Sequence, residues 1–562
     1  MSDSAPDSAR KHHISRRAFV GAGVTGAIAA VVGIDACGSA AVPSATQSVP
    51  RAAPPSTQVT QFELEEVTLA DLQRGMVSGR YTSRSLCEAY LGRIAELDRQ
   101  GPMLRAVLQL NPEALAIAAA LDSERKTRGT RGPLHGVPVL IKDNIDTHDR
   151  MTTAAGSAAL ANSVAPRDSF VAERLRAAGA VILGKSNLSE WANFRSTHAS
   201  SGWSGLGGQT RNPYALDRTP SGSSSGSGTA VSANLCAIAV GTETDGSITS
   251  PASVASLVGI KPTVGLVSRA GIIPISHSQD TAGPMARTVT DAAILLSALA
   301  AVDPRDPATT AGSGRSAVDY TRFLRADGLR GARIGVARKK YFGYSVQADH
   351  IAELALDAMR RAGAVVVDPA DIATAANLDA DEFDVLLYEF KHDLNAYLAS
   401  LGPTARMKSL HDLIAYNSAH AAEEMPYFGQ EIFTMAEAKG PLTEKKYLSA
   451  LRTGHVRSRA GGIDATMTKY RLDAIVAPTQ GPPGLIDLVN GDAGGGSVTS
   501  PAAIAGYPHI TVPAGYAFGL PVGMSFFGRA WSEPTLITLA YAFEQATRAR
   551  RAPRLLPTAL LT

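Results

Sequence analysis

Hydroxyl-bearing side chains and glycines gather in two short clusters of this 562-residue chain, at 221–227 and 242–250. The first cluster reads SGSSSGS and the second TETDGSITS, and a segment of small residues, 229–240, lies between them. Small residues allow neighbouring segments to approach closely, and glycines allow several backbone N–H groups to converge on one point. A serine that attacks a carbonyl carbon needs this geometry, because N–H donors must stabilise the resulting oxyanion. The pattern predicts the active site of a serine hydrolase.

Two other interpretations of these clusters are open to test. Runs of glycine and serine are commonly flexible linkers. Here, however, the apolar runs 235–240 and 254–260 flank the second cluster and place it inside a folded core. A phosphate-binding loop would need G-x-x-x-x-G-K-S/T, or G-x-G-x-x-G after a strand with an acidic partner, and the stretch from 217 to 262 contains neither.

A candidate base is Lys142, which directly follows the apolar residues 139–141 in the segment GVPVLIKDNI. A lysine at the end of a strand usually extends into water. On a strand, Lys142 and Asp143 point to opposite faces, so this carboxylate need not neutralise the amine. An amine buried in apolar surroundings has a lowered pKa and can act as a base near neutral pH.

Histidines are the competing candidates for the base. His135, His277 and His509 lie near the segments described above, which keeps a Ser-His-Asp triad open as an alternative mechanism. The chain has no G-x-S-x-G motif with a strand before it and a helix after it, and each histidine also fits an ordinary loop or core position. We therefore favour a serine hydrolase whose base is not histidine.

The surrounding elements have an α/β pattern. A helix that ends at a glycine leads into a short apolar strand at 169–183 and again at 351–367. Since the apolar run 332–336 precedes the second helix, we expect parallel strands joined by a helix. Residues 474–477 predict a further buried strand.

Several helix boundaries are also readable. Thr68 and Thr82 are predicted N-caps of two early helices. Apolar side chains at helical spacing over 383–397 predict a helix that ends near Gly402. A capped helix is expected to begin at Ser532 and to carry arginines at its C-terminal end, at positions 548, 550 and 551.

The N-terminal 40 residues predict a twin-arginine export signal rather than part of the fold. The motif SRRAF at 15–19 precedes a mildly apolar stretch, 18–34, which is too weakly hydrophobic for a strong membrane span. The sequence I-D-A-C ending at Cys37 resembles a lipobox, although its acidic residue is unusual there, so a lipid anchor and ordinary cleavage both remain open. Residues 41–61 are rich in Pro, Ser and Ala and predict a disordered linker. We expect a periplasmic or other extracytoplasmic location.

Composition narrows the class of protein. With 45% hydrophobic and 19% charged residues and 52 glycines, the chain is typical of a loop-rich globular enzyme. A formal net charge of +3 is nearly balanced, so no nucleic-acid partner is expected. Cys87 and Cys236 are expected to be buried free thiols, and the absence of C-x-x-C and H-E-x-x-H motifs gives no reason to expect a metal or another cofactor. We expect a monomer whose catalytic domain spans 62–562, with 310–465 as a mainly helical elaboration near the cleft.

Three motifs together carry a family resemblance. They are the segment ending at Lys142, the serine/glycine cluster around Ser223, and GTETDGSITSPAS with GIKPT after it. In order and spacing they resemble the amidase signature family, and Ser247 lies 24 residues after Ser223, as in that family. The resemblance extends from about residue 65 to the C-terminus. It implies an α/β fold with a large mixed β-sheet flanked by helices.

The resemblance also implies catalytic roles. Ser247 takes the place of the nucleophile, Ser223 bridges it to the base and follows a cis peptide bond with Gly222, and Lys142 is the terminal base. A neutral Lys142 would accept the proton of Ser223 while Ser223 accepts that of Ser247, which gives an activated serine without histidine.

The oxyanion hole implied by the family consists of backbone N–H groups from Thr244 through Asp245 and Gly246 to Ser247. Asp245 stands where the broad family usually has glycine. Its carboxylate could accept a hydrogen bond from a substrate NH₂, or it could bond to its own backbone as many turn aspartates do. Further departures from the broad family are Ser221, Ser225, Glu243 and Thr249, most of which the peptide-amidase branch shares.

The expected activity is release of ammonia from unsubstituted carboxamides through an acyl-enzyme, with C-terminal peptide amides as the favoured substrates. Aryl or short aliphatic amides are the first alternative. The second is a protein similar to the amidase-like component of the tRNA-dependent amidotransferases, which the export signal disfavours because tRNA is cytoplasmic. A catalytically silent binding protein is the third, disfavoured because all three catalytic positions are intact.

Overall fold

The computed structural model describes residues 61–312, 314–315 and 318–561. The predicted export signal, Cys37 with its lipobox-like motif, and the linker up to residue 60 lie outside the described residues. Among the helices of the described chain, none combines the length and apolar character that a membrane crossing requires.

Thirteen strands are present in the described residues: β1 (Val107–Leu110), β2 (Pro138–Lys142), β3 (Val181–Ser186), β4 (Trp203–Ser204), β5 (Gly208–Gln209), β6 (Ile238–Glu243), β7 (Val258–Lys261), β8 (Thr281–Ala286), β9 (Arg333–Val336), β10 (Val365–Val367), β11 (Ala474–Pro478), β12 (His509–Ala517) and β13 (Leu520–Phe527). All but β4 and β5 form one mixed sheet in the order β1-β3-β2-β6-β8-β7-β12-β13-β11-β9-β10. Its parallel pairs are β2 with β3, β2 with β6, β9 with β10 and β9 with β11, and the other pairs are antiparallel. The large mixed sheet predicted from the family resemblance is therefore confirmed.

The α-helices of the described residues are α1 (Leu69–Val77), α2 (Ser83–Ile94), α3 (Ala114–Arg128), α4 (Phe170–Ala177), α5 (Ser225–Ser232), α6 (Thr249–Val254), α7 (Val289–Leu299), α8 (Ala308–Ala311), α9 (Val346–Arg361), α10 (Asp379–Ser400), α11 (Leu410–Ala419), α12 (Ala421–Glu424), α13 (Glu431–Glu437), α14 (Lys445–Ser458), α15 (Asp464–Tyr470), α16 (Ser500–Ala505) and α17 (Glu533–Thr547). Short 3₁₀ or π turns lie at 95–99, 158–160, 190–193, 320–323, 375–377 and 459–463. Thr68 and Thr82 cap α1 and α2 with their side chains, as predicted.

The predicted β-α-β unit is present, and the helix and strand predicted at 169–183 belong to another one. α4 lies between β2 and β3 in the chain, and α9 lies between β9 and β10, and each strand pair is parallel. The glycines after the two helices, Gly179 and Gly363, have φ values of 75° and 93°, which favour glycine over other residues. Cys87 and Cys236 are buried and free, as expected.

One predicted boundary is partly wrong. α17 starts at Glu533, but Ser532 makes no capping hydrogen bond with its side chain, which donates instead to the carbonyl of Arg529 at 2.7 Å. The helix also ends before the predicted arginines, and Arg550 pairs with Glu66 at 2.8 Å. Arg550 thus forms an ion pair with a residue far away in the sequence and does not stabilise the C-terminal end of α17.

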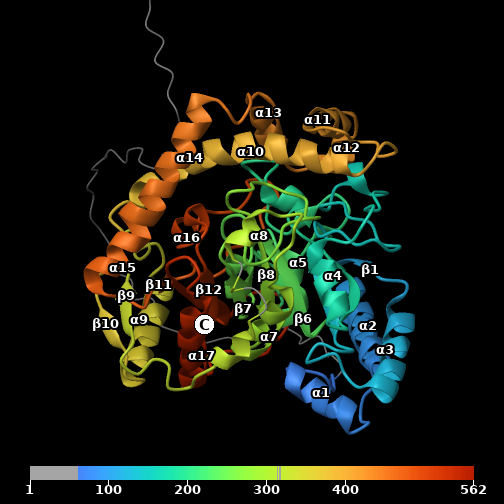
Figure 1. The fold of residues 1–562 in the computed structure, drawn as a ribbon, viewed down its shortest axis with the longest axis horizontal. Helices are drawn as coiled ribbons and strands as arrows, with labels where there is room; N and C mark the ends of the chain where they lie inside the picture. The colour runs from blue at the N-terminus through green and yellow to red at the C-terminus, as the bar shows by residue number, and fades with distance from the viewer. Residues whose placement is uncertain (1–60, 313, 316–317, 562) are drawn as a thin grey trace, which may run out of the picture. The chain divides into compact units, whose positions relative to one another are not determined.

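The segment 310–465 contributes both to the sheet and to a helical cover. Its first part supplies β9, α9 and β10, and its second part supplies α10 to α14, which form a separate layer along the upper side of the molecule in Figure 1. We call this layer the cover. Its apolar side chains form a core with those of three loops, 154–160, 188–194 and 273–275. The core includes Ala154, Leu160, Trp191, Phe194, Ile273, Ile275, Leu386, Phe390, Leu394, Leu410, Ile432 and Phe433. The helices of the cover are therefore packed onto the loops at one edge of the sheet.

Candidate active site

Two neighbouring parallel strands bring the candidate base to the serine clusters. Lys142 is the last residue of β2, and Thr242 is near the end of β6, which pairs with β2 through Ile141 and Val240. Because the strands are parallel, their carboxyl ends lie at the same edge of the sheet. Residues 223 and 247 follow from the loops that lead into α5 and α6.

The amine of Lys142 is fully buried and surrounded by uncharged oxygens. Its Nζ lies 2.7 Å from the Oγ of Ser223, 2.9 Å from the Oγ1 of Thr242 and 3.3 Å from the carbonyl oxygen of Thr242. Burial lowers the pKa of Lys142 to about 7, while the charges of Asp280 and Glu243 oppose this shift. The amine can therefore be neutral near physiological pH, as a general base must be.

The carboxylate next to Lys142 is directed elsewhere, as the strand geometry predicted. The Oδ2 of Asp143 accepts hydrogen bonds from the backbone N–H groups of Ala154 at 3.3 Å and Gly156 at 3.0 Å. Burial raises the pKa of Asp143 to about 7, and the charge that lowers it most is that of Lys185. Asp143 thus does not form an ion pair with Lys142.

Ser223 and Ser247 belong to segments that are joined through the backbone. The peptide bond between Gly222 and Ser223 is cis, as the family resemblance implied. The N–H of the next residue, Ser224, donates to the carbonyl of Ser247 at 3.1 Å. The Oγ of Ser224 also donates to the carbonyl of Thr242 at 3.1 Å, so one residue connects both clusters to β6.

Exposure to solvent distinguishes the three predicted catalytic residues. Ser247 is 8% exposed, whereas Ser223 and Lys142 are 0% exposed. A nucleophile must reach the substrate, while a residue that only transfers protons need not. The exposures therefore match a scheme in which Ser247 faces the substrate, while Ser223 and Lys142 are both fully buried.

The turn that carries Ser247 is held by Glu243. The Oε2 of this carboxylate accepts hydrogen bonds from the backbone N–H groups of Ile248 at 2.8 Å and Thr249 at 2.9 Å, and from the hydroxyl of Thr249 at 3.1 Å. Glu243 and Thr249, two departures from the broad family, are thus in direct contact. Within the described residues, the backbone N–H groups of 245–247 donate no hydrogen bond, so they are available to an oxyanion.

Gly246 is required at the centre of this turn. Its φ is +78°, and a Cβ atom there would lie 3.0 Å from the Oγ of Ser250 and 3.2 Å from the Oγ1 of Thr499. Ser221 has a φ of 56° at a position where the broad family usually has glycine. Ser221 therefore adopts the left-handed backbone conformation although it carries a Cβ atom.

Asp245 lies beside the buried carboxyl group of Glu382. Its Oδ1 is buried and has no hydrogen-bond partner in the part of the chain that the structure describes, so this oxygen does not bond to its own backbone. Burial and the charge of Asp245 raise the pKa of Glu382, on α10 of the cover, well above its usual range. The amide Nε2 of Gln279 donates to the Oε1 of Glu382 at 3.0 Å.

Comparisons of the sequence and of the fold with known proteins show the family of this chain. The sequence model of the Amidase family matches residues 85–537. The chain belongs to the amidase signature family. A probable amidase of Arabidopsis thaliana is 46% identical over 502 residues, which cover 88% of this chain and 92% of that protein. The structure of native peptide amidase from Stenotrophomonas maltophilia superposes with a TM-score of 0.84 at 51% identity, covering 88% of this chain and 99% of that chain.

Relatives of another activity are also present. A glutamyl-tRNA(Gln) amidotransferase component from Roseiflexus sp. (strain RS-1) is 33% identical over 504 residues, 86% of this chain and 97% of that protein. The family and these similarities identify the chain as an amide-hydrolysing enzyme, and the fold is that of peptide amidase.

In this amidase-family chain none of the three candidate histidines is hydrogen-bonded to Ser223 or Ser247 within the described residues. The Nε2 of His135 lies 3.0 Å from the carbonyl oxygen of Leu121, and the Nε2 of His509 lies 2.6 Å from the Oγ of Ser525. The Nδ1 of His277 lies 2.9 Å from the Oδ2 of Asp393, on the cover helix α10. The described geometry gives no support to a Ser-His-Asp triad at Ser247.

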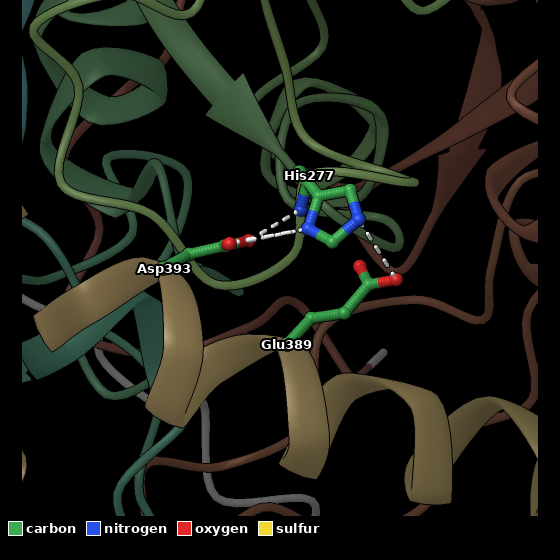
Figure 2. A group of neighbouring side chains, drawn as sticks. All are labelled: His277, Glu389 and Asp393. Atoms are coloured by element: carbon green, nitrogen blue, oxygen red, sulfur yellow. Dashed lines mark hydrogen bonds and ion pairs between the residues drawn. The ribbon is translucent and has the colours of Figure 1, made fainter. Parts of the chain in front are cut away.

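His277 is part of a cluster that the sequence analysis did not find. With Glu389 and Asp393 it forms the group of His and acidic side chains, among the described residues, that lie close enough together to hold a metal ion. Figure 2 shows the carboxylate of Asp393 beside one ring nitrogen of His277 and the carboxylate of Glu389 beside the other. Glu389 is already engaged by the hydroxyl groups of Ser276 at 2.5 Å and Tyr447 at 2.7 Å. The cluster therefore joins the loop of His277 to the cover, and its oxygens have partners within the protein.

Proposed function

We propose that this protein is a serine amidohydrolase that releases ammonia from carboxamides through an acyl-enzyme formed on Ser247. The observation that carries the proposal is the buried amine of Lys142, which lies 2.7 Å from the Oγ of Ser223 and has only uncharged hydrogen-bond partners. Ser223 in turn belongs to a segment that is bonded to the backbone of Ser247 through Ser224.

The reaction proceeds in balanced steps. The Oγ of Ser247 attacks the carbonyl carbon of the amide while its proton moves to Ser223, and the proton of Ser223 moves to the neutral amine of Lys142. The N–H groups of 245–247 stabilise the tetrahedral oxyanion. When the C–N bond breaks, the protonated lysine returns a proton through Ser223 to the nitrogen, which leaves as ammonia. Water then attacks the acyl-enzyme by the same relay, which yields a carboxylic acid and restores Ser247.

C-terminal peptide amides are the substrate class that we propose. Support comes from the 51% identity with the peptide amidase of Stenotrophomonas maltophilia, whose name states its substrate. The carboxylate of Asp245 in the oxyanion turn adds a physical reason, because it disfavours substrates that carry a negative charge near the reacting carbonyl. Aryl or short aliphatic amides on the same site are the alternative.

A panel of peptide amides, aryl amides, aliphatic amides and esters tests this proposal, with ammonia and new carboxylates measured by mass spectrometry. We expect peptide amides to be hydrolysed fastest. Ser247→Ala should reduce ammonia release by on the order of 10⁶, as loss of a serine nucleophile does elsewhere. Ser250→Ala is the matched control, because Ser250 is also 8% exposed and follows three residues later. Near-normal turnover by Ser247→Ala would exclude the acyl-enzyme scheme.

A role in ammonia transfer is the second candidate, favoured by the amidotransferase relative at 33% identity. Ammonia release by the purified chain without any partner protein would distinguish a hydrolase from such an amidotransferase component. We further propose export of the protein, on the strength of the SRRAF motif at 15–19. Replacing Arg16 and Arg17 by lysine should leave the protein in the cytoplasm, and unchanged export of that variant would contradict this proposal.

A further inference from the structure

Asp280 lies opposite the start of the oxyanion turn because of strand register. β8 runs antiparallel to β6, and Glu243 pairs with Thr281. The next residues outward, Thr244 and Asp280, therefore face each other where both strands end. The Oδ1 of Asp280 accepts a hydrogen bond from the hydroxyl of Thr244 at 2.6 Å.

The other oxygen of the same carboxylate organises the loop that precedes it. The Oδ2 of Asp280 accepts the backbone N–H groups of Ile275 at 2.8 Å and Ser276 at 2.9 Å. One side chain thus joins the loop 275–280 to Thr244, the residue at which the oxyanion turn begins. Hydrogen bonds to a carboxylate are among the stronger ones in proteins, so this connection is a firm one.

The cover holds this loop from its other side. The Oε2 of Glu389 accepts the N–H of Ser278 at 3.0 Å and its hydroxyl at 2.9 Å, and the Oδ2 of Asp393 accepts the N–H of His277 at 2.9 Å. Figure 2 shows both carboxylates reaching from α10 toward the loop. The cover, the loop and the oxyanion turn are therefore connected by hydrogen bonds in that order.

Asp280 also lies close to the base, because its partner Thr244 is two residues after Thr242, whose hydroxyl and carbonyl oxygens are hydrogen-bonded to the Nζ of Lys142. The charged groups that act on Lys142 are Asp280 and Glu243, and both favour its protonated form. Glu243 is engaged by the turn and also faces Lys261. Asp280 faces the cation of Arg269, while burial raises its pKa to about 6, so it is mostly ionised at pH 7.

We infer that Asp280 is a positioning residue of the amidase reaction: it fixes the start of the oxyanion turn through Thr244 and directs a negative charge toward Lys142. The inference rests on the proposed function, since it assigns a role to Asp280 through the base and the oxyanion donors. It separates into two parts that different substitutions can test. Asp280→Asn removes the charge and keeps the shape, whereas Thr244→Val removes the hydrogen bond and keeps the charge.

The experiment measures the rate at which a fluorophosphonate labels Ser247 between pH 5 and 9, since this reaction needs an activated serine but no particular amide. In Asp280→Asn, the midpoint of the acid limb should move to lower pH by about one unit, because an opposite charge nearby no longer stabilises the protonated lysine. In Thr244→Val, the plateau rate should fall about tenfold with the midpoint unchanged, because the donors are less well placed.

Asp291→Asn is the matched control. Burial raises the pKa of Asp291 to about 6 as well, but this carboxylate accepts the N–H of Leu69 at 3.2 Å, at the start of helix α1. It should leave both the midpoint and the plateau unchanged. Thermal unfolding of each variant shows whether the fold is kept. If Asp280→Asn does not fold, Thr244→Val still tests whether the hydrogen bond to Asp280 positions the oxyanion turn.

The outcomes separate this inference from the proposed function. No labelling of Ser247 in the unmodified protein would overturn the serine-lysine scheme itself. Normal labelling with the same pH midpoint in Asp280→Asn would overturn the charge role of Asp280, and a full plateau rate in Thr244→Val would overturn its positioning role.

Discussion

Two buried lysines on neighbouring strands differ in one respect that decides their chemistry. Lys142 ends β2, and Lys185 lies on β3, where it pairs in register with Ile141. Both are 0% exposed, and burial lowers the pKa of both. The Nζ of Lys185 donates to the carbonyl of Ile145 at 2.5 Å and to the Oγ1 of Thr153 at 3.0 Å.

The difference lies in the charges around the two amines. Lys185 faces the carboxylates of Asp143 and Asp146, which favour its protonated form. For Lys142 the carboxylates that favour the protonated form are Asp280 and Glu243, and burial still lowers its pKa to about 7. Four carboxylates favour the protonated form of Lys185 and two favour that of Lys142, which is why we propose Lys142 as the base. Sheet position alone therefore does not make a catalytic lysine.

Among the tests of this comparison between the two lysines, removing each amine in turn has the largest expected effect. Lys142→Met should lower ammonia release by on the order of 10³–10⁴, because the general base is lost. Lys185→Met should keep the pH dependence of the reaction but lower the free energy of unfolding by about 3–5 kcal/mol, because Asp143 and Asp146 lose their counter-charge. Steady-state kinetics and urea unfolding of both variants measure these effects.

The two variants are each other's controls, since both replace a fully buried lysine by a side chain of similar length. An active Lys142→Met enzyme would show that another group is the base. A Lys185→Met enzyme that is as stable as the original but inactive would reverse the assignment of the two lysines.

The next effect concerns the connection between the base and the nucleophile. Ser223→Ala should lower ammonia release by about 10²–10³ and leave a small remaining activity, because a water molecule can replace a hydroxyl less effectively in proton transfer. Ser227→Ala is a suitable comparison, since Ser227 is also fully buried and lies in the same cluster, where its hydroxyl is 2.8 Å from that of Ser186. Equal losses in the two variants would argue that Ser223 acts only through packing.

Much of the fold could be predicted from local patterns. The apolar run 332–336, the helix that ends before Gly363 and the apolar strand after it predicted the parallel pair of β9 and β10, since a connection through one helix allows little else. The apolar run before Lys142 predicted its burial, because the strand is covered on both faces. The cis bond before Ser223 was implied by the family resemblance and by nothing in the local pattern.

The remaining parts of the site depend on contacts between distant segments. Thr242 is a partner of Lys142 across 100 residues, and Asp280 reaches Thr244 through the register of β6 and β8. The joint between His277 and α10 spans 116 residues. No spacing rule in a single sequence gives these pairs, because they depend on which strands are neighbours. The run of polar residues at the end of β6, 242–245, was the available signal.

The pH dependence of the reaction is the third test of the comparison. Lys142 must be neutral to accept a proton, so kcat/KM should rise with pH and level off above the pKa of about 7. Below that midpoint the rate should fall about tenfold per pH unit, as expected for one essential deprotonated group. The charges that act on Lys142 are those of Asp280 and Glu243, so Lys185→Met should not move this midpoint.

The profile must be recorded where the chemical step limits the rate. Amides with leaving groups of different basicity establish this, since their rates differ only when C–N cleavage is limiting. A profile that stays flat from pH 5 to 9 under these conditions would show that Lys142 is not the base.

The smallest effect is on stability, and its sign distinguishes the two lysines most directly. The pKa of Lys142 is about 7 in the folded chain and about 10.4 in an unfolded one. Between these values the unfolded chain binds one more proton, so the contribution of Lys142 to stability rises with pH. Below pH 7 both states are protonated, and the full cost of burying the charge is present. Lys142→Met removes that cost but also loses buried hydrogen bonds, so at pH 6 we expect a net stabilisation of about 2 kcal/mol.

This advantage should shrink toward pH 10, whereas Lys185→Met should be destabilised throughout. Urea unfolding of the three proteins at pH 6, 8 and 10 measures the differences, and a Lys142→Met variant that is less stable than the original at pH 6 would mean that the site stabilises the charged amine after all.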